Sequence, residues 1–517
     1  MKKKSYNSYL QSFYFFLLGI LTSFSLPPYN YWIINFFTFS FIVILLFKNL
    51  EKNSLKKFFF YGYFFGFGYF LFSLYWIPFS LTHDENFKSF IPLAMIMIPA
   101  FLSIFYAIAF LLLKFFSNSK SLIINILILS LSLSLLEFLK GNILSGFPWN
   151  LFAYSLSENI NLIQINSIIG VYSFNTILIT IFCAPSILYF SRKKKNILSF
   201  TFLFLVFMSF YIFGFLKVKN FNNENDQILH TKIKILSTTI PIERFYSNVS
   251  SEEILKKLIY LSDPKYNKKT IFIWPEGVIP NTNLKDLKKK YRSLFEKKFG
   301  DNHIIIIGIN DSEEDKGIKK YYNSLSVIDN KINILYKYYK NKLVPFGEFI
   351  PLENFLSKLG FKSLTNNYQS YTASNERKIF NYKDDFEIKV LPLICYEIIY
   401  SGNLSENNNY KFIVNISEDG WFGNSIGPYQ HFAHTIFRSI EYGKYTLRSA
   451  NNGISAIINP VGQTIEKISI NNEGSILLNK VKKFDKTIFS TYGNKIYFLI
   501  ILLYIFLIFS FTKIENE

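Results

Sequence analysis

The sequence has little cysteine and is short of acidic residues. Its only cysteines among 517 residues are Cys183 and Cys395. They lie too far apart, and are too few, for the disulfide framework of a small secreted protein, so they say nothing about redox compartment. Asp and Glu number 36 against 56 Lys and Arg, which gives a formal net charge of +20. Such an excess of cations is typical of proteins that bind nucleic acid or a membrane surface.

Long stretches of the chain lack charge altogether, and half of all residues are hydrophobic. A helix that crosses the hydrocarbon core of a bilayer needs about 20 apolar residues. The pattern therefore predicts about eight membrane spans, seven early and one near the C-terminus. Greasy segments flanked by basic residues favour a membrane over nucleic acid, and we expect no nucleic-acid partner. The charge-free stretches are 5–47 (broken by Pro27-Pro28), 58–82, 89–113, 121–136, 160–191, 196–216 and 496–512.

The charges of the short loops predict the orientation of these spans. Segments 2–4, 48–57 and 192–195 are basic, whereas the alternate loop 83–88 carries Asp84 and Glu85. Cytoplasmic loops carry the excess of Lys and Arg. We therefore expect both termini in the cytoplasm and the segment after the seventh span on the external side.

Composition changes sharply after Lys217. Residues 1–217 are predicted to form a membrane domain, 218–227 a polar linker, 228–486 a soluble α/β domain, and 487–517 a C-terminal membrane helix with a short tail. In the soluble part, short β-rich runs alternate with helical patterns. Helices are expected at 251–261, 284–299 and 430–447.

Three apolar runs of the soluble part end in residues that can do chemistry. TIFIWPE ends in Glu276, KYYKNKLVPFGE contains Lys340 and Glu348, and VLPLIC ends in Cys395. Strands often deliver functional side chains at their carboxyl ends. A strand followed by a cysteine and a turn into a helix is the geometry of a nucleophile elbow. Taken singly, a solvated loop residue or a buried structural cysteine is the commoner reading; the combination favours a catalytic site.

The combination resembles the nitrilase, or carbon–nitrogen hydrolase, superfamily, which uses Glu, Lys and Cys in this order. The whole chain resembles a bacterial membrane branch, the apolipoprotein N-acyltransferases. The resemblance implies an α-β-β-α sandwich inserted between seven N-terminal helices and one C-terminal helix. It also implies a multi-pass protein of the bacterial inner membrane with its catalytic domain on the periplasmic side. The motifs are SLPPYNYW, GFPWN, WPEGVIP, KNKLVPFGEFIPLE, LICYE, DGWFGNSIGPYQH and RSANNGISAIINPVG.

The resemblance also assigns roles to individual residues. Glu276 matches the general base, Lys340 the cation that stabilises the oxyanion, and Cys395 the nucleophile. Where the family often has Gln-Gly-Asn before Ile-Pro, this chain has Ser-Thr-Thr at 237–239. The remaining assignments are Glu348 and Glu397 as supporting carboxylates, Tyr396 as a flanking residue, and Trp149 and Trp421 at a lipid portal.

The implied reaction moves an acyl chain from a phospholipid, through a Cys395 thioester, to the α-amine of a diacylglyceryl-cysteine on a prolipoprotein. It needs neither a cofactor nor a metal. His431 and His434 have the i, i+3 spacing of a ligand pair but lack a third ligand nearby, so we expect structural or surface histidines. We expect the enzyme to be a monomer in the bilayer.

Two other functions remain open from the residues alone. A membrane-tethered amidase or nitrilase would share the three catalytic residues, but a tether needs only one helix. A transporter with an external domain should carry buried charges along a pathway. Glu137 and Lys140 are the main charged pair near a predicted span, which supports a transporter only weakly.

Overall fold

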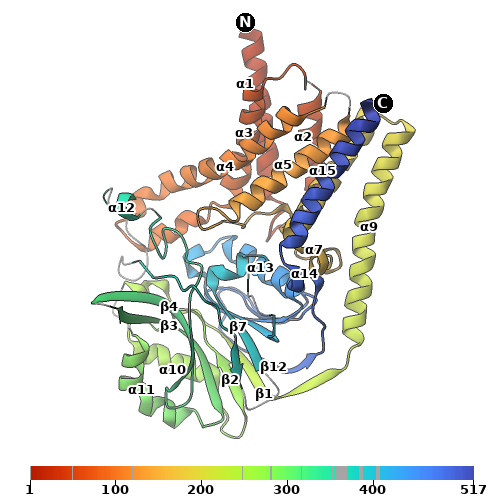
Figure 1. Cartoon of the computed structure of the whole chain (residues 1–517). Coiled ribbons are helices and arrows are strands. Elements are labelled where there is room, and N and C mark those ends of the chain that lie inside the picture. Colours follow the sequence, from red (N-terminus) through yellow and green to blue (C-terminus); the bar gives the residue numbers. More distant parts are fainter. Residues whose placement is uncertain are drawn as a thin grey trace.

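Apolar helices gather at one end of the chain's computed structural model, and two β-sheets lie at the other (Figure 1). Both termini lie at the helical end, away from the sheets (Figure 1). The structure describes residues 2–48, 50–118, 121–246, 249–279, 282–315, 317–351, 353–356, 358, 370–382, 388–402, 404 and 408–516.

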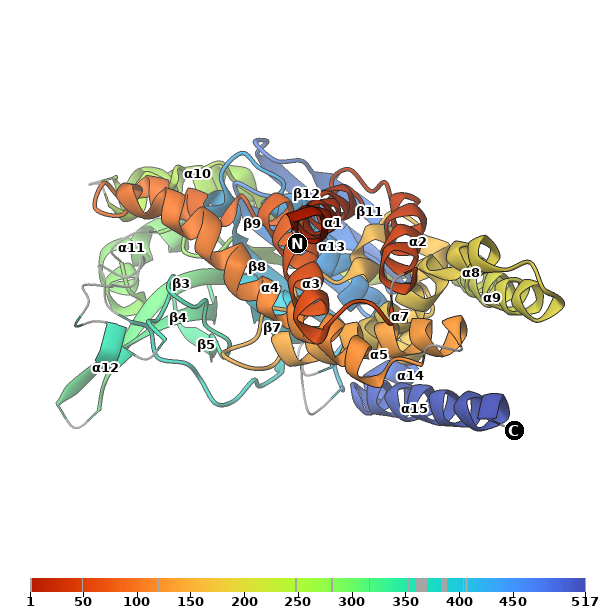
Figure 2. The ribbon, with the colours of Figure 1, turned by 90° about the horizontal axis from the view of Figure 1, so that it is seen from above.

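The helical end is a bundle with two peripheral helices. Helices α9 and α15 lie at its outer side (Figure 2). The helices are α1 (Lys2–Ser23), α2 (Ile34–Phe47), α3 (Leu55–Ser73), α4 (Ile91–Phe116), α5 (Leu122–Lys140), α6 (Ile160–Ile163), α7 (Asn166–Phe182), α8 (Ala184–Phe190), α9 (Lys194–Asn223), α14 (Ile488–Tyr492) and α15 (Lys495–Asn516). Short 3-10 helices are η1 (Ile77–His83), η2 (Lys88–Phe90) and η3 (Phe152–Leu156).

The expected number of seven early spans is not confirmed. By length and composition, five helices of the described chain can cross a membrane: 88–116, 122–140, 166–190, 194–223 and 495–515. A sixth candidate is the pair 55–73 and 77–83, bent by 45°. The charge-free stretch 5–47 folds as two helices whose apolar parts, 9–23 and 34–47, are shorter than a full span.

Helix α7 is broken where the soluble part of the chain meets it. Gly170 has φ +73°, which a glycine adopts readily. A side chain there would collide with the Phe489 ring, 2.0 Å from the position of a Cβ atom. The N–H of Val171, which begins the second half of the helix, donates to Glu441 Oε1 at 2.8 Å. A carboxylate of the soluble part thus caps a membrane helix.

The residues expected to form a linker are mostly helical. Helix α9 continues to Asn223, and the first strand begins at Asp226. The Asn- and Lys-rich composition resembles a loop, but Phe221 is buried and packs on Phe484 with ring centroids 5.7 Å apart. That contact holds the last turn of the helix against the soluble part.

Two six-stranded mixed sheets form the soluble part. Their orders are β12-β1-β2-β3-β4-β5 and β11-β10-β9-β8-β7-β6. Strands β1, β2 and β3 run parallel, as do β7, β8 and β9. The strands are β1 (Asp226–Ser237), β2 (Thr270–Ile273), β3 (His303–Asp315), β4 (Ile318–Ile328), β5 (Ile334–Tyr339), β6 (Phe380–Tyr382), β7 (Ile388–Ile394), β8 (Phe412–Glu418), β9 (Tyr445–Asn451), β10 (Ser455–Ile458), β11 (Thr464–Ile468) and β12 (Gly474–Lys482).

Helices cover the outer faces of the two sheets. Helices α10 (Ser251–Ser262) and α11 (Leu284–Lys298) pack on the first sheet through a buried cluster that includes Leu255 and Phe272. Helix α13 (Gly427–Tyr442) covers the second sheet. The predicted α-β-β-α sandwich is confirmed. Short helices η4 (Ile242–Phe245), α12 (Glu353–Leu356), η7 (Cys395–Ile399) and η8 (Asp419–Phe422) connect the strands.

The expected helix at 430–447 ends earlier than predicted. Gly443 adopts φ +61° and stops α13 at Tyr442, and residues 445–447 belong to β9 instead. Glycine just beyond the last turn is a common helix stop. The β-branched and aromatic residues that follow suit a buried strand, because they pack well on a pleated surface.

Candidate active site

Glu276 lies three residues after β2, on a turn that Gly277 completes with φ +56°. Its side chain is buried, and both carboxylate oxygens accept hydrogen bonds. Oε1 accepts from Asn323 Nδ2 at 2.7 Å and lies 3.5 Å from Lys340 Nζ; Oε2 accepts from the Glu418 N–H at 2.9 Å. A Cβ atom at Gly308 would lie 2.5 Å from the Glu276 Cα, so only glycine lets β3 pass this close.

Lys340 follows β5 directly and is almost fully buried. Its Nζ donates to Glu348 Oε1 at 2.9 Å, and its backbone N–H donates to the Asn323 carbonyl at 2.9 Å. Burial alone would lower the pKa of Lys340, but the Glu348 and Glu276 carboxylates outweigh it and raise the pKa above its ordinary value. The lysine is therefore a fixed cation in a dry site.

Glu348 sits in the PFGE turn, where Phe346 adopts φ +62°. Its Oε2 accepts from the Val344 N–H at 2.9 Å, which closes the turn. Its Oε1 accepts from Asn323 Nδ2 at 2.7 Å, so one amide group holds both Glu276 and Glu348. Sequence analysis missed Asn323, because an asparagine on an inner strand carries no motif of its own.

Cys395 stands at the end of β7 with φ +48°, a left-handed backbone that residues other than glycine rarely adopt. Burial raises the pKa of its thiol above the ordinary value, the Glu276 carboxylate adds to the rise, and the Lys340 ammonium opposes it. The charges of both other residues of the predicted triad therefore act on the thiol. A thiol with a raised pKa needs a base to form the reactive thiolate.

Glu397 ties the turn after Cys395 to the segment after Lys340. Its carboxylate is fully buried and accepts from the Ile394 N–H at 2.8 Å and the Asn341 N–H at 2.9 Å. Burial would raise the pKa of Glu397, but the Arg377 guanidinium, at 2.7 Å, and the other donors lower it below the ordinary value. Glu397 is an anchoring carboxylate between two strand ends.

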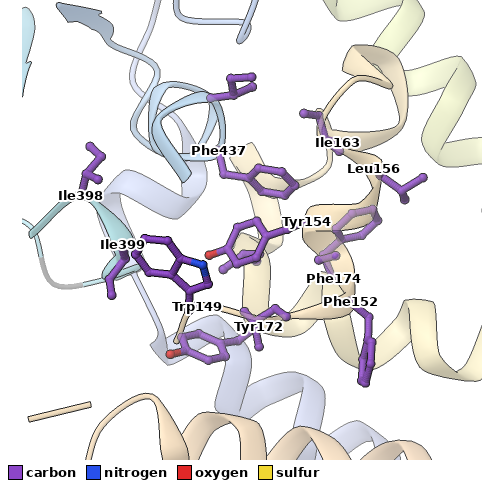
Figure 3. Close-up of a cluster of buried hydrophobic side chains, with 14 of the residues drawn as sticks. Trp149, Phe152, Tyr154, Leu156, Ile163, Tyr172, Phe174, Ile398, Ile399 and Phe437 are labelled. Carbon is purple, nitrogen blue, oxygen red and sulfur yellow. The ribbon is translucent and has the colours of Figure 1, made fainter. Parts of the chain in front are cut away.

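Tyr396 points the other way, toward the helical end of the molecule. Its hydroxyl donates to the Gly146 carbonyl at 2.8 Å, in the loop that follows α5. Tyr396 belongs to a buried cluster of side chains from both ends of the molecule, part of which is shown in Figure 3. Its labelled members are Trp149, Phe152, Tyr154, Leu156, Ile163, Tyr172 and Phe174 from the helical end, and Ile398, Ile399 and Phe437 from the sandwich.

The two tryptophans predicted at a lipid portal lie in different surroundings. Trp149 is buried, and its Nε1 donates to Gln430 Oε1 at 2.8 Å. Trp421, on η8, is partly exposed and stacks on Phe245 with ring centroids 5.7 Å apart. The His83 ring, from η1, meets the Trp421 ring edge-on at 5.8 Å. Trp149 is therefore part of the interface core, whereas Trp421 lies where solvent reaches it.

Both histidines of α13 are buried, so the surface alternative is excluded. His431 Nδ1 lies 3.0 Å from Asp419 Oδ1, and its Nε2 lies 3.3 Å from the Cys395 carbonyl. His434 packs on Tyr154, with ring centroids 4.2 Å apart. Among the described residues, no group of three His, Cys, Asp or Glu side chains could hold a metal ion.

The site thus places a thiol, a carboxylate with a free lone pair and a fixed ammonium at the ends of three strands, β7 of one sheet and β2 and β5 of the other. A thiol that is deprotonated by a neighbouring carboxylate can attack a carbonyl carbon, and a buried cation stabilises the oxyanion that results. This combination suits acyl transfer through a covalent thioester.

Comparisons with known proteins agree with this chemistry. Residues 18–184 match the sequence profile of the apolipoprotein N-acyltransferase N-terminal domain, and residues 260–482 match that of the carbon-nitrogen hydrolases. The apolipoprotein N-acyltransferase of Rickettsia prowazekii is 33% identical, over 97% of this chain and 98% of its own length. That of Rhodopseudomonas palustris is 32% identical, over 89% of this chain and 87% of its own length. An amidase from Nesterenkonia sp. aligns with 49% of this chain and 91% of its own at a TM-score of 0.33 and 10% identity.

Proposed function

Because the chain belongs to the apolipoprotein N-acyltransferase family, we propose that Glu276, Lys340 and Cys395 carry out the acyl transfer for which that family is named. The acyl donor is a phospholipid, and the acceptor is the α-amine of the S-diacylglyceryl-cysteine of a prolipoprotein. The observation that carries the assignment is the convergence of these three side chains, with Lys340 Nζ 3.5 Å from Glu276 Oε1 and both charges acting on the Cys395 thiol.

In the first half-reaction, Glu276 takes the thiol proton as Cys395 Sγ attacks the ester carbonyl of the phospholipid. The Oε1 atom of Glu276 already has two donors and Oε2 has one, so Oε2 is the oxygen with room for the proton. The ester C–O bond then breaks. The departing lysophospholipid oxygen receives the proton from Glu276, and a thioester remains on Cys395.

Two donors face the negative oxygen that forms during the attack. The first is the Lys340 ammonium, whose raised pKa keeps it charged. The second is the backbone N–H of Tyr396. In a trans peptide the N–H points opposite to the carbonyl, and the Cys395 carbonyl is anchored by Asn415 from β8 and by His431 from α13. Each such donor contributes about 10²–10³ in rate in enzymes of this kind.

In the second half-reaction the acceptor amine attacks the thioester. An α-amine has a pKa of about 7.7–8.0, so a good fraction is neutral near pH 7. Glu276 accepts the proton that the amine loses, the C–S bond breaks, and the proton returns to the Cys395 sulfur. The amide product leaves with the thiol regenerated, which makes the sequence ping-pong.

The helical end gives this chemistry access to its substrates. Each buried CH₂ of an acyl chain is worth about 0.8 kcal/mol, so drawing whole lipids into water would cost too much. A catalytic domain that rests on membrane helices receives the ester from the side of the bilayer. The partly exposed aromatic cluster of Trp421, Phe245 and His83 is the proposed rim of the lipid entrance.

The proposed location is the bacterial inner membrane, with the sandwich on the periplasmic side. The basic loops and the position of both termini at one end of the molecule support it. Asn267→Cys, an exposed position on the sandwich, should react with a membrane-impermeant thiol reagent in intact spheroplasts on a Cys395→Ser background. Cys183 is fully buried, so we expect it not to react with the reagent. Reaction only after lysis would reverse the orientation.

The proposed function is tested by tracking a labelled acyl chain from the phospholipid to the enzyme and then to the acceptor peptide. Full-length enzyme in detergent micelles, given a phospholipid with a fluorescent acyl chain, should carry one label on Cys395 that hydroxylamine removes. Adding a diacylglyceryl-cysteine peptide with a free amine should move the label to the peptide. Cys183→Ser should behave as the wild type. The assignment would be wrong if Cys395→Ser enzyme still became labelled. It would also be wrong if water accepted the acyl chain in place of the peptide amine.

A further inference from the structure

The carbonyl of the nucleophile is held by a closed network of side chains behind the active site. Asn415 Nδ2 and His431 Nε2 each lie 3.3 Å from the Cys395 carbonyl oxygen. Arg448 hydrogen-bonds through Nη1 to Asn415 Oδ1, and through Nη2 to Asp419 Oδ2 at 2.8 Å. All four side chains are fully buried. The network is therefore shielded from solvent, and its hydrogen bonds fix the positions of its members.

The contacts of His431 place a hydrogen on Nε2. Nε2 faces a carbonyl oxygen, which can only accept, so Nε2 carries a hydrogen. Nδ1 lies between a donor and an acceptor, 3.1 Å from Arg448 Nη2 and 3.0 Å from Asp419 Oδ1. The Asp419 charge is met by Arg448 and by the Ser417 hydroxyl, at 2.7 Å. Burial and the Arg448 charge lower the pKa of His431, and the Asp419 carboxylate opposes them.

Aromatic rings from two segments hold the His431 ring in place. Trp149, from the loop at the helical end, stacks on it with ring centroids 5.4 Å apart and planes 29° apart. Phe422, the neighbour of Trp421, meets it edge-on at 5.4 Å. The imidazole that holds the nucleophile's backbone is thus clamped between the helical end and the loop at the proposed lipid entrance.

We propose that His431 is a positioning residue for acyl transfer: as an Nε2–H donor to the Cys395 carbonyl, it holds the left-handed backbone of the nucleophile and so aims the Tyr396 N–H at the oxyanion. The proposal rests on the proposed function, because the oxyanion forms only if Cys395 is acylated. It goes beyond the triad, because His431 touches neither substrate nor sulfur. The residue acts through the peptide that joins Cys395 to Tyr396.

Two reactions of the same thiol separate this role from mere packing. Acylation by a phospholipid needs the oxyanion donors, whereas alkylation by iodoacetamide forms no oxyanion and depends on the thiolate alone. His431→Leu should slow single-turnover acylation of Cys395 by about 100-fold, the loss typical of one oxyanion donor, while alkylation stays within about threefold. His431→Gln keeps an N–H in reach of the carbonyl and should acylate within about tenfold of the wild type.

His434→Leu is the matched control. His434 is buried on the same helix one turn further on, and it packs on the same Trp149 ring at 5.2 Å. In the described part of the chain no hydrogen bond joins it to Cys395. The rates of Cys395 acylation and alkylation in His434→Leu should change by the same factor. The loss of the His434 ring disturbs packing but leaves the hydrogen bonds to the Cys395 carbonyl in place.

Three results would overturn the proposal: acylation of His431→Leu at the wild-type rate, an equal fall of acylation and alkylation in that variant, or no advantage of His431→Gln over His431→Leu. Failure of the wild-type enzyme to form any acyl adduct would instead count against the proposed function. The two failures are therefore distinguishable in one set of measurements.

Discussion

Two buried Glu–Lys clusters lie in different parts of this molecule, one in helix α5 and one in the sandwich, and only one of them is built for chemistry. In α5, Lys140 Nζ lies 2.7 Å from Glu137 Oε2, and both side chains are almost fully buried. In the sandwich, Lys340 Nζ lies 2.9 Å from Glu348 and 3.5 Å from Glu276. Burial and ion pairing are common to both clusters, so neither property identifies an active site.

The difference lies in the balance of charge and in what closes each cluster. The α5 pair is one acid to one base. Tyr106 donates to Glu137 at 2.5 Å, and the Phe70 ring covers the Lys140 ammonium at 4.7 Å. The sandwich cluster has two acids to one base, and the thiol of Cys395 lies within its field. A surplus carboxylate beside a nucleophile, rather than a buried charge, indicates the catalytic site.

The largest expected effect is the loss of the nucleophile. Cys395→Ser should lower turnover by at least about 10⁴-fold, because an alkoxide is much harder to form here than a thiolate. The measurement is transfer of a labelled acyl chain to a lipopeptide, on enzyme shown to be folded by gel filtration. Turnover within tenfold of the wild type would remove Cys395 from the mechanism and leave the sandwich cluster no better explained than the α5 pair.

Loss of the surplus acid should come next. Glu276→Gln removes the proton acceptor and should slow acylation of Cys395 by about 10²–10⁴-fold at pH 7. The thiol pKa is raised, so little thiolate forms unaided at neutral pH, and the fraction grows as pH rises toward that pKa. The variant should therefore recover steadily between pH 7 and pH 10 in single-turnover assays. A full rate at pH 7 would transfer the role of base to Glu348 or Glu397.

Removing the catalytic cation should cost less than removing the base. Lys340→Met should slow acylation by about 10²–10³-fold, the range typical of one oxyanion contact. Alkaline pH should help this variant much less than Glu276→Gln, because a thiolate without its oxyanion donor still attacks slowly. Equal recovery of the two variants at high pH would contradict the division of roles.

The smallest effect on activity should come from the α5 pair. Lys140→Met leaves Glu137 buried without its cation and should lower the free energy of unfolding by about 3–5 kcal/mol. The double variant Glu137→Gln with Lys140→Met should regain most of that stability. Acyl transfer per folded molecule should stay within about threefold of the wild type, as measured against the folded fraction. A large fall in turnover with unchanged stability would show that the two clusters are more alike than their contacts suggest.

The positions of the three central residues could be predicted because their signals are local. An apolar run that ends in WPE, in KNK or in CYE marks a strand end, and parallel strand ends of the two sheets meet. The partners of these residues could not be predicted in the same way. Asn323 reaches Glu276 across 47 residues of sequence, and His431 reaches Cys395 across 36. Such contacts depend on sheet order and helix placement, which no short pattern encodes.

The helical end shows a second limit of the sequence. A count of uncharged residues detects greasy segments, but it does not detect where they bend. The stretch 160–191 reads as one span, and 166–190 is long and apolar enough for one, but it is divided into α7 and α8, and Gly170 breaks α7. The break is in contact with Glu441, 270 residues further along the chain from Val171, and with Phe489 near the C-terminal helix.

The cap that Glu441 gives to α7 has a consequence for biosynthesis. The ribosome delivers α7 to the membrane long before it makes Glu441, and the sandwich folds on the other side of the bilayer in the proposed orientation. Until then the Val171 N–H has no partner from the sandwich. The helical bundle therefore lacks the Glu441 cap of α7 until the sandwich has been made. A nascent chain arrested before α13 should hold α7 in a looser state than the full-length protein. In the proposed orientation, the membrane part is completed only after the sandwich has been exported and has folded.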